Sequence, residues 1–383
     1  MIATRLPSAP LLAAAVLSLL AAGAATAQKP RARDLGIPFD GAPGPLNAIT
    51  DVAGVTVGHA TIVEGEAVRT GVTAVLPRGP ASASDPVYAG WYSLNGNGEM
   101  TGTTWIEESG FLEGPVMITN THSVGVVRDA VISWRIAQGA ADASGYWWSL
   151  PVVAETWDGW LNDINGFHVT ESHAHRALAA AAGGAVAEGN VGGGTGMVCY
   201  EWKGGIGTAS RRVAHTVGEL TVGVLVQANF GRRAQATLAG VPVGRAIPEG
   251  AIYSQETGSI IVVVATDAPL LPHQLKRLAR RVPLGLARTG ATSGNGSGDI
   301  FVAFSTANAG AQKTAGKVTV ESIVNDDLSP LFDATVQAVE EAIVNALVAA
   351  ETMTGRSGTV QAMPRQRVVE LLREHGRLVE PQR

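Results

Sequence analysis

Several short runs of apolar residues are almost uninterrupted, and they constrain the fold more than any other feature of this 383-residue chain. A strand with one face in water alternates apolar and polar residues, whereas a strand covered on both faces is apolar throughout. Short runs rich in β-branched residues therefore predict strands buried on both faces. The predicted strands are 71–76, 115–118, 222–226, 260–265 and 300–304.

Helical patterns alternate with these strands. Residues 271–282 predict a helix, because Pro272 suits a first helical turn and Leu275 and Leu278 fall on one face. A longer helix is predicted over 333–352 and a shorter amphipathic one over 368–374. The alternation indicates an α/β fold in which helices cover layers of sheet, and no low-complexity linker divides it into two domains.

Composition narrows the class of protein. The chain is 46% apolar and 16% charged, and its 33 acidic and 28 basic residues give a net charge of -5. That balance permits a large core and provides no basic surface for nucleic acid. The single cysteine, Cys199, excludes an internal disulfide and a cysteine-rich zinc cage, and its apolar surroundings predict a buried packing residue.

Residues 1–27 predict a secretory signal peptide. Arg5 precedes an apolar run over 11–22, and Ala25-Thr26-Ala27 forms a small-residue cleavage site. The run is short for a bilayer span, although an uncleaved membrane anchor is the alternative. We therefore expect a mature domain over 28–383 that is periplasmic or secreted and not membrane-associated.

Glycines gather in four clusters, at 95–98, 192–196, 204–207 and 294–298. Such clusters predict tight turns where the backbone passes close to another group, and we expect them to build a pocket. Neither 192–196 nor 204–207 fits a dinucleotide fingerprint, because Met197 and Ser210 occupy the place of the third glycine. A phosphate-binding loop, a zinc-protease helix and a G-x-S-x-G elbow are also missing from the sequence.

A polar loop ends at Gly258, and Ser259 opens the apolar run that follows. An N-terminal-nucleophile hydrolase needs this arrangement before maturation, because glycine tolerates strained backbone and exposes its carbonyl carbon to the next hydroxyl. Scission would free an α-amino group on Ser259, whose reference pKa of about 7.7 to 8.0 suits a general base. An ordinary turn from loop to strand fits the same residues.

Six stretches of sequence occur together in one order: 31–36, 47–52, 151–156, 187–196, 225–229 and 265–270. In this the chain resembles the L-aminopeptidase/D-amidase-esterases and β-peptidyl aminopeptidases (the DmpA/BapA type), which are self-processing N-terminal-nucleophile hydrolases. The resemblance implies a four-layer α-β-β-α sandwich, cleaved into an α chain of 28–258 and a β chain of 259–383. It further implies a homo-oligomer, such as a tetramer of αβ pairs, that needs no metal or organic cofactor.

The resemblance also implies roles for particular residues. Ser259 would be the nucleophile, supported by Ser297 and Asp299. Asn229 would hold the oxyanion, and Glu155 would bind the free ammonium group of the substrate. Members of the β-peptidyl type carry glutamate at the position of Asp299, so the reach of the shorter side chain is in question. Capped turns at 229 and 297–299 and a surface carboxylate at 155 are the simpler interpretations.

Tyr146, Trp147 and Trp157 lie near Glu155 in the sequence and would form a side-chain pocket, or else pack in the core or an interface. The implied function is that of an exported serine aminopeptidase or amidase acting on short peptides, amides or esters through an acyl-enzyme. β-Peptides, L-amino amides and D-alanine amides or esters all remain candidate substrates. The alternatives are an acyltransferase of the ornithine acetyltransferase type, which uses a threonine nucleophile in the cytoplasm, and a non-catalytic periplasmic binding protein.

Overall fold

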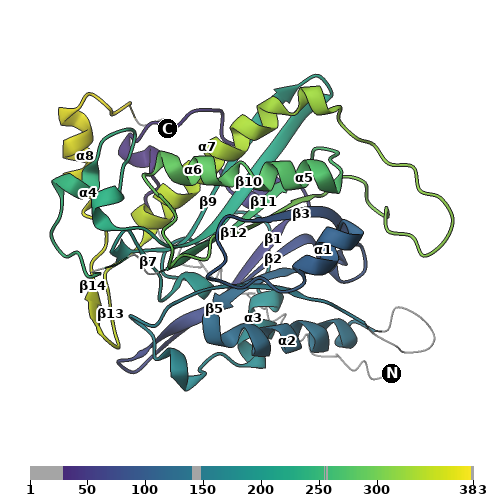
Figure 1. Cartoon of the computed structure of the whole chain (residues 1–383), viewed down its shortest axis with the longest axis horizontal. Helices are drawn as coiled ribbons and strands as arrows, with labels where there is room; N and C mark the ends of the chain where they lie inside the picture. Colours follow the sequence, from purple (N-terminus) through teal and green to yellow (C-terminus); the bar gives the residue numbers. More distant parts are fainter. Residues whose placement is uncertain (1–28, 140–147, 254, 256–257, 381–383) are drawn as a thin grey trace, which may run out of the picture.

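Two β-sheets pack face to face at the centre of the computed structural model, which describes residues 29–139, 148–253, 255 and 258–380 (Figure 1). The larger sheet contains, in spatial order, β4 (Phe111–Leu112), β3 (Val87–Ser93), β12 (Ile300–Ser305), β11 (Ser259–Thr266), β10 (Gly218–Asn229) and β9 (Gly205–His215). The smaller sheet contains β1 (Thr56–Glu64), β2 (Val68–Pro80), β5 (Val116–Asn120) and β6 (Val152–Thr156).

Helices cover the outer face of each sheet (Figure 1). The larger sheet is covered by α5 (Pro272–Ala279), α6 (Val282–Arg288) and α7 (Ser329–Ala349), with α8 (Arg365–Glu374) at one end. The smaller sheet is covered by α2 (Val124–Ala137) and α3 (Glu171–Ala179). The layers therefore run helix, sheet, sheet, helix, which confirms the predicted four-layer sandwich. Smaller elements are α1 (Thr103–Ser109), α4 (Val243–Ala246) and the hairpins β7 (Val198–Cys199) with β8 (Trp202–Lys203) and β13 (Met353–Gly355) with β14 (Gly358–Val360).

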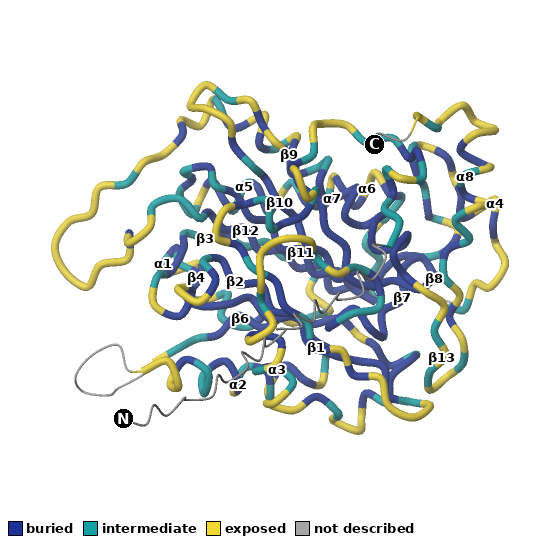
Figure 2. The backbone as a smooth tube through the Cα atoms, turned by 180° about the vertical axis from the view of Figure 1, so that it is seen from behind, coloured by how far each residue is buried: buried dark blue, intermediate teal, exposed yellow. Residues whose placement is uncertain are grey.

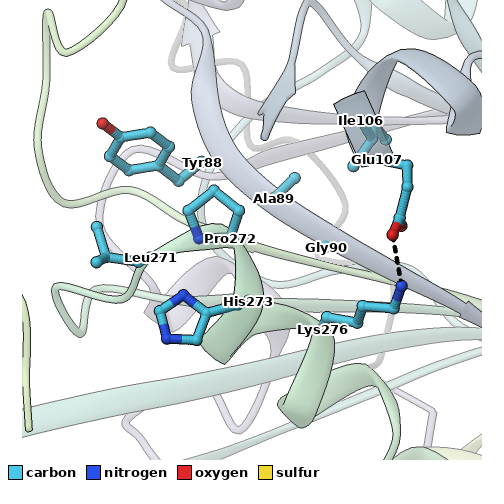
Figure 3. Close-up of a pocket in the computed structure, with 9 residues that line it drawn as sticks. All are labelled: Tyr88, Ala89, Gly90, Ile106, Glu107, Leu271, Pro272, His273 and Lys276. Carbon is cyan, nitrogen blue, oxygen red and sulfur yellow. Dashed lines mark hydrogen bonds and ion pairs between the residues drawn. The ribbon is translucent and has the colours of Figure 1, made fainter. Parts of the chain in front are cut away.

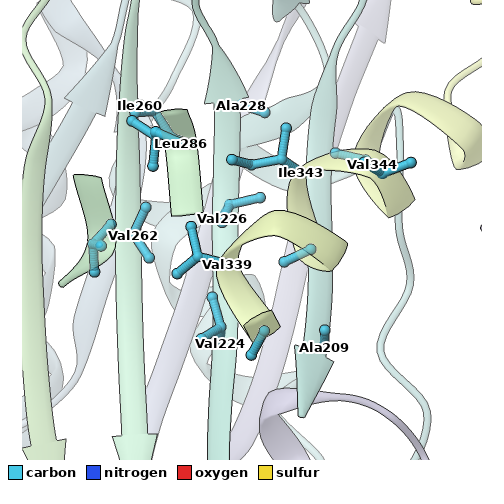
Figure 4. Packing of buried hydrophobic residues seen from close by; sticks show 14 of the residues in the cluster. Ala209, Val224, Val226, Ala228, Ile260, Val262, Leu286, Val339, Ile343 and Val344 are labelled. Carbon is cyan, nitrogen blue, oxygen red and sulfur yellow. The ribbon is translucent and has the colours of Figure 1, made fainter. Parts of the chain in front are cut away.

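Strand β11 shows why the predicted strands are apolar on both faces. Ile260 and Val262 pack with Leu286 of α6 and Val339 of α7 (Figure 4). Residues 261, 263 and 265 belong instead to the apolar cluster between the two sheets. Figure 2 shows the consequence, a buried centre surrounded by exposed loops. Because alternate side chains share a face, the side chain of Ser259 points toward the layer between the sheets.

The five predicted strands all occur, and one predicted helix ends earlier than predicted. The pattern over 271–282 forms α5, which ends at Ala279, and α6 begins at Val282 with Pro283 in its first turn. Proline lacks the backbone N–H that a continuous helix needs, so a single helix cannot run through this position. Cys199 is fully buried in the core, as predicted.

Some predictions fall on residues that the structure does not describe. The predicted signal peptide at 1–27 is one, and Tyr146 and Trp147 are others. Within the described ranges, no helix combines the length and the apolarity that a bilayer span requires.

Candidate active site

Strand pairing places Asn229, the last residue of β10, directly opposite Ser259, the first residue of β11. The preceding Gly258 has a φ of +136°, which side-chain-bearing residues rarely adopt. A Cβ at this position would lie 2.0 Å from the carbonyl oxygen of Asn229 and 3.2 Å from its Nδ2. Only glycine fits here, and the Asn229 amide consequently lies against the residue that precedes Ser259.

The hydroxyl of Ser259 is buried and contacts the loop that carries Ser297 and Asp299. Its Oγ accepts a hydrogen bond of 3.0 Å from the backbone N–H of Gly298. On either side of Gly298, the Ser297 hydroxyl donates to Oδ1 of Asp299 over 2.6 Å. The same oxygen accepts the N–H of Ile260, the residue after Ser259, at 3.2 Å. Ser259, Ser297 and Asp299 are therefore assembled around Gly298.

Asp299 reaches Ser297 although its side chain is one methylene shorter than glutamate. Burial raises the pKa of Asp299, and hydrogen bonds from Ser297, Ser293 and the N–H of Ile260 lower it in part. Its own N–H donates to Oδ1 of Asn95 at 2.7 Å, which ties this loop to the glycine cluster at 95–98. The shorter side chain of Asp299 is therefore long enough to contact Ser297.

The amide of Asn229 is held at both ends. Its Oδ1 accepts the N–H of Val198 at 2.7 Å, and its Nδ2 donates to the carbonyl of Trp157 at 2.8 Å. Because a backbone N–H must face the amide oxygen and a carbonyl must face the nitrogen, these partners determine the orientation of the amide. Nδ2 carries a second hydrogen that neither bond uses, and this hydrogen can donate to an oxyanion.

Replacing Asn229 with alanine is expected to lower kcat by about 100- to 1000-fold, because one oxyanion donor is typically worth that much in an acyl-transfer reaction. KM should change little, since the donor acts mainly in the transition state. Steady-state kinetics on a p-nitroanilide measure both, with kcat expressed per cleaved chain and with thermal unfolding as a check on folding. An unchanged kcat in a folded variant would remove Asn229 from the oxyanion site.

Glu155 lies near the end of β6 and is only 3% exposed. Its Oε1 accepts the N–H of Glu99 at 2.9 Å, and its Oε2 accepts the hydroxyl of Thr121. Burial raises the pKa of Glu155, and the bonds from Thr121 and the Glu99 N–H offset part of that rise. A substrate ammonium at this carboxylate would favour its charged form and form a charge-assisted hydrogen bond.

One cavity of about 700 Å³ connects Glu155 with Ser259. Trp157 and Gln255 line its walls, together with residues of the glycine clusters at 95–98 and 294–298. These clusters touch each other, since a Cβ on Gly298 would lie 2.3 Å from the carbonyl oxygen of Asn97. Of the glycines that line the cavity, Gly98 lies against the carboxylate, because a Cβ there would lie 3.3 Å from Oε1 of Glu155.

The other two glycine clusters do not build this cavity, so that part of the prediction is wrong. A Cβ on Gly193 would lie 2.1 Å from Oε1 of Gln227, and one on Gly207 would lie 2.0 Å from the carbonyl oxygen of Ala342. These glycines allow close packing within the core, next to β10 and α7. A glycine cluster indicates that the backbone passes close to another group. That group can belong to the core or to the wall of a cavity.

The structure therefore brings together the predicted site residues that it describes, whereas Tyr146 and Trp147 lie outside the described residues. The residues brought together are Glu155, Trp157, Asn229, Gly258, Ser259, Ser297 and Asp299. The structure adds Thr121, Glu99 and Gln255 to the cavity wall, none of which the sequence indicated. Asn95 and Asn97 stood in a predicted glycine cluster, but nothing in the sequence marked Thr121 as a partner of a residue 34 positions later. The contact between Thr121 and Glu155 forms only because the ends of β5 and β6 lie side by side in the sheet.

A second cavity, of about 400 Å³, lies between α1 and α5 and contains none of the predicted site residues (Figure 3). Its two oppositely charged side chains, Glu107 and Lys276, pair with each other at 2.7 Å. For metal binding, the described part of the chain contains no group of three or more His, Cys, Asp or Glu that could hold an ion.

Comparisons with known proteins show the family of this chain and its fold. Residues 47–361 match the model of peptidase family S58. The chain is 56% identical to the β-peptidyl aminopeptidase BapA of Sphingosinicella microcystinivorans, over 95% of this chain and 97% of that protein. Among solved structures, the L-aminopeptidase D-Ala-esterase/amidase of Ochrobactrum anthropi, described as a variant of the Ntn hydrolase fold, gives a TM-score of 0.87 at 51% identity, covering 92% of this chain and 100% of that one. A β-aminopeptidase of Burkholderia sp. gives 0.84 at 51% identity, covering 91% and 99%.

Proposed function

The chain belongs to peptidase family S58 and is an aminopeptidase of the N-terminal-nucleophile type, and from this premise we propose that it is an exported β-peptidyl aminopeptidase activated by self-cleavage at Gly258–Ser259. The observation that carries the proposal is the shared cavity, in which a serine hydroxyl and a buried carboxylate face one space. One group can attack a carbonyl while the other holds the amino end of the same substrate.

Self-cleavage would proceed by an N-to-O acyl shift. The Ser259 Oγ attacks the carbonyl carbon of Gly258, the C–N bond breaks, and the hydroxyl proton passes to the nitrogen that becomes the α-amine. Water then hydrolyses the Gly258 ester, which leaves a carboxylate on Gly258 and restores the hydroxyl of Ser259. The glycine-only backbone at 258 and the nearby Asn229 amide support this step, since an amide N–H can stabilise the oxyanion of either intermediate.

In the cleaved enzyme, the α-amine of Ser259 would accept the proton of its own hydroxyl as that hydroxyl attacks the substrate. Glu155 would bind the substrate ammonium and Asn229 would stabilise the tetrahedral oxyanion. The amine would return the proton to the leaving group, and water would resolve the acyl-enzyme. Ser297 and Asp299 would hold the Gly298 loop against the nucleophile. No cofactor takes part in this scheme.

Three further features belong to the proposal. Export to the periplasm or beyond follows from the segment at 1–27, and assembly into a homo-oligomer of αβ pairs follows from the family. The β-peptidyl preference follows from the 56% identical relative. An ornithine-type acyltransferase fits less well, because Ser259 stands where that type carries threonine.

A panel of p-nitroanilides tests the substrate class. We expect the β-homoalanine compound to be hydrolysed with a higher kcat/KM than the L-alanine or D-alanine compounds. N-acetylation should suppress hydrolysis of all three, since it removes the cation that Glu155 would bind. A higher kcat/KM on an α-amino amide would contradict the β-peptidyl assignment, and hydrolysis unaffected by acetylation would contradict the aminopeptidase mechanism.

A further inference from the structure

A buried turn close to the active site has backbone geometry that residues other than glycine rarely adopt. Tyr200 and Glu201 are consecutive and have φ values of +51° and +61°. Both residues are almost fully buried, between the short strands β7 and β8. Left-handed conformations in such residues cost free energy and persist only where the surrounding structure holds them. The contacts that hold this turn therefore indicate what it is for.

Arg233, which begins a short 3-10 turn after β10, holds the turn at 200–201. Its Nε donates to the carbonyl of Tyr200 at 3.0 Å, and its Nη2 donates to the carbonyl of Glu201 at 2.8 Å. Its guanidinium lies 4.0 Å from the ring centre of Trp202, and its own N–H donates to Oε1 of Glu201 at 3.0 Å. Arg233 is four positions after Asn229, so the turn is joined to the strand that carries the oxyanion donor.

The side chains of Glu201 and Arg233 also bind the segment 247–253, which leads to Gly258. Oε2 of Glu201 accepts the N–H of Ile252 at 2.6 Å and the N–H of Tyr253 at 3.1 Å. Nη1 of Arg233 donates to the carbonyl of Ile247 at 3.2 Å and to that of Glu249. A carboxylate therefore binds two backbone donors, and a guanidinium binds two backbone acceptors, on one stretch of chain.

The charge of Glu201 suits this contact. Burial raises the pKa of its carboxyl, but hydrogen bonds from the N–H groups of Arg233, Tyr253 and Ile252 and from the Arg232 side chain outweigh it, and the net pKa is lowered. The ionised form that accepts these bonds is thus the favoured one. The Tyr253 ring also meets Trp160 edge-on at 5.5 Å, and the Ile252 side chain packs in the same small cluster.

These contacts restrain the chain on both sides of the bond that the proposed self-cleavage would break. Tyr253 is held by Glu201, and Ser259 is held by its pairing with Asn229. We propose that Glu201 and Arg233 form a clamp that positions the 247–253 segment, so that the carbonyl of Gly258 is presented to the Ser259 hydroxyl. The inference rests on the proposed self-cleavage and assigns both residues a positioning role in it. Misplacing reacting atoms by about 1 Å can cost about 100-fold in rate.

The test is the rate of self-cleavage of Glu201→Gln, followed by cell-free synthesis of the full chain and denaturing gels over time. The glutamine loses the charge and one acceptor, so we expect cleavage to slow by about tenfold to 100-fold. Material that has been cleaved should keep a kcat and KM within about twofold of wild type, because Glu201 does not contact the substrate cavity. A purely structural defect would lower stability, and it would not slow self-cleavage while leaving the kcat of the cleaved enzyme unchanged.

Glu341→Gln is the matched control. Glu341 lies on α7 and is also a buried carboxylate, and it pairs with Arg211 at 2.7 Å and with Arg33 at 2.8 Å. Folding of both variants is compared by thermal unfolding in a Ser259→Ala background. The clamp is overturned if Glu201→Gln cleaves at the wild-type rate, or if Glu341→Gln, at equal loss of stability, slows cleavage as much. Wild-type protein that never cleaves would overturn the proposed function itself.

A second pair of variants keeps the test valid if Glu201→Gln does not fold. Ile252→Pro removes one N–H that Glu201 accepts, and Ile252→Ala keeps that N–H while shortening the same side chain. We expect the proline variant to cleave about tenfold more slowly than the alanine variant. Equal cleavage rates for the two would overturn the clamp.

Discussion

Replacing Ser259 with alanine is expected to leave one uncut chain with no measurable amidase activity. The substitution removes the hydroxyl that would attack Gly258 during maturation and the same hydroxyl that would attack the substrate. Loss of a catalytic serine lowers kcat by about 10⁶-fold in a well-studied serine protease, and here the unformed α-amine adds to the loss. A denaturing gel and a p-nitroanilide assay on the purified variant measure both effects.

Ser305→Ala provides the matched control. Ser305 is buried in the neighbouring strand β12, pairs with the far end of β11, and donates to the carbonyl of Ala268 at 2.6 Å. Its loss should lower stability but leave cleavage complete and activity near that of wild type. Two normal fragments from Ser259→Ala would show that another residue is responsible for cleavage.

Glu155→Gln is expected to lower kcat/KM for substrates with a free amino group by about 100-fold. The amide has nearly the same shape but no charge, and truncating or neutralising one partner of a buried charge pair costs about 2 to 5 kcal/mol. Self-cleavage should remain complete, because Gly258 carries no free ammonium when it is attacked. The variant therefore separates substrate recognition from maturation, which Ser259→Ala cannot do.

The control for Glu155→Gln changes the substrate instead of the protein. With an N-acetylated p-nitroanilide, wild type and variant should both be slow and should differ little, since the partner of the carboxylate is missing. Steady-state kinetics with the free and the acetylated substrate form a complete cycle. Equal loss on both substrates would mean that Glu155 has a structural role instead of binding the ammonium.

Much of the fold was predictable because burial leaves a direct trace in the sequence. The strand at 260–265 is apolar on both faces, and the structure covers it with helices on one side and the second sheet on the other. Helix boundaries were less predictable. The helix predicted over 271–282 ends early, at Ala279, because Pro283, just after that range, lacks the N–H that would bond to the carbonyl of Ala279. The four-layer arrangement itself came from family resemblance, not from periodicity.

The candidate site divides in a similar way. Ser259 and Gly258 are neighbours in sequence, so their local chemistry was readable, and Ser297 with Asp299 formed a short local pattern. Glu155 and Ser259 meet only because the smaller sheet packs on the larger one, and no local pattern encodes that contact. Thr121 and the N–H of Glu99, which hold the Glu155 carboxylate, come from two further segments. Contacts of this kind depend on tertiary structure.

The central claim is that one backbone bond breaks to create the nucleophile. Intact-mass spectrometry of the purified wild-type protein, combined with N-terminal sequencing of the smaller fragment, measures this directly. The account predicts two chains from one precursor, the smaller of which begins Ser-Ile-Ile-Val at Ser259. A single full-length active chain, or a fragment that begins at any other residue, would contradict it.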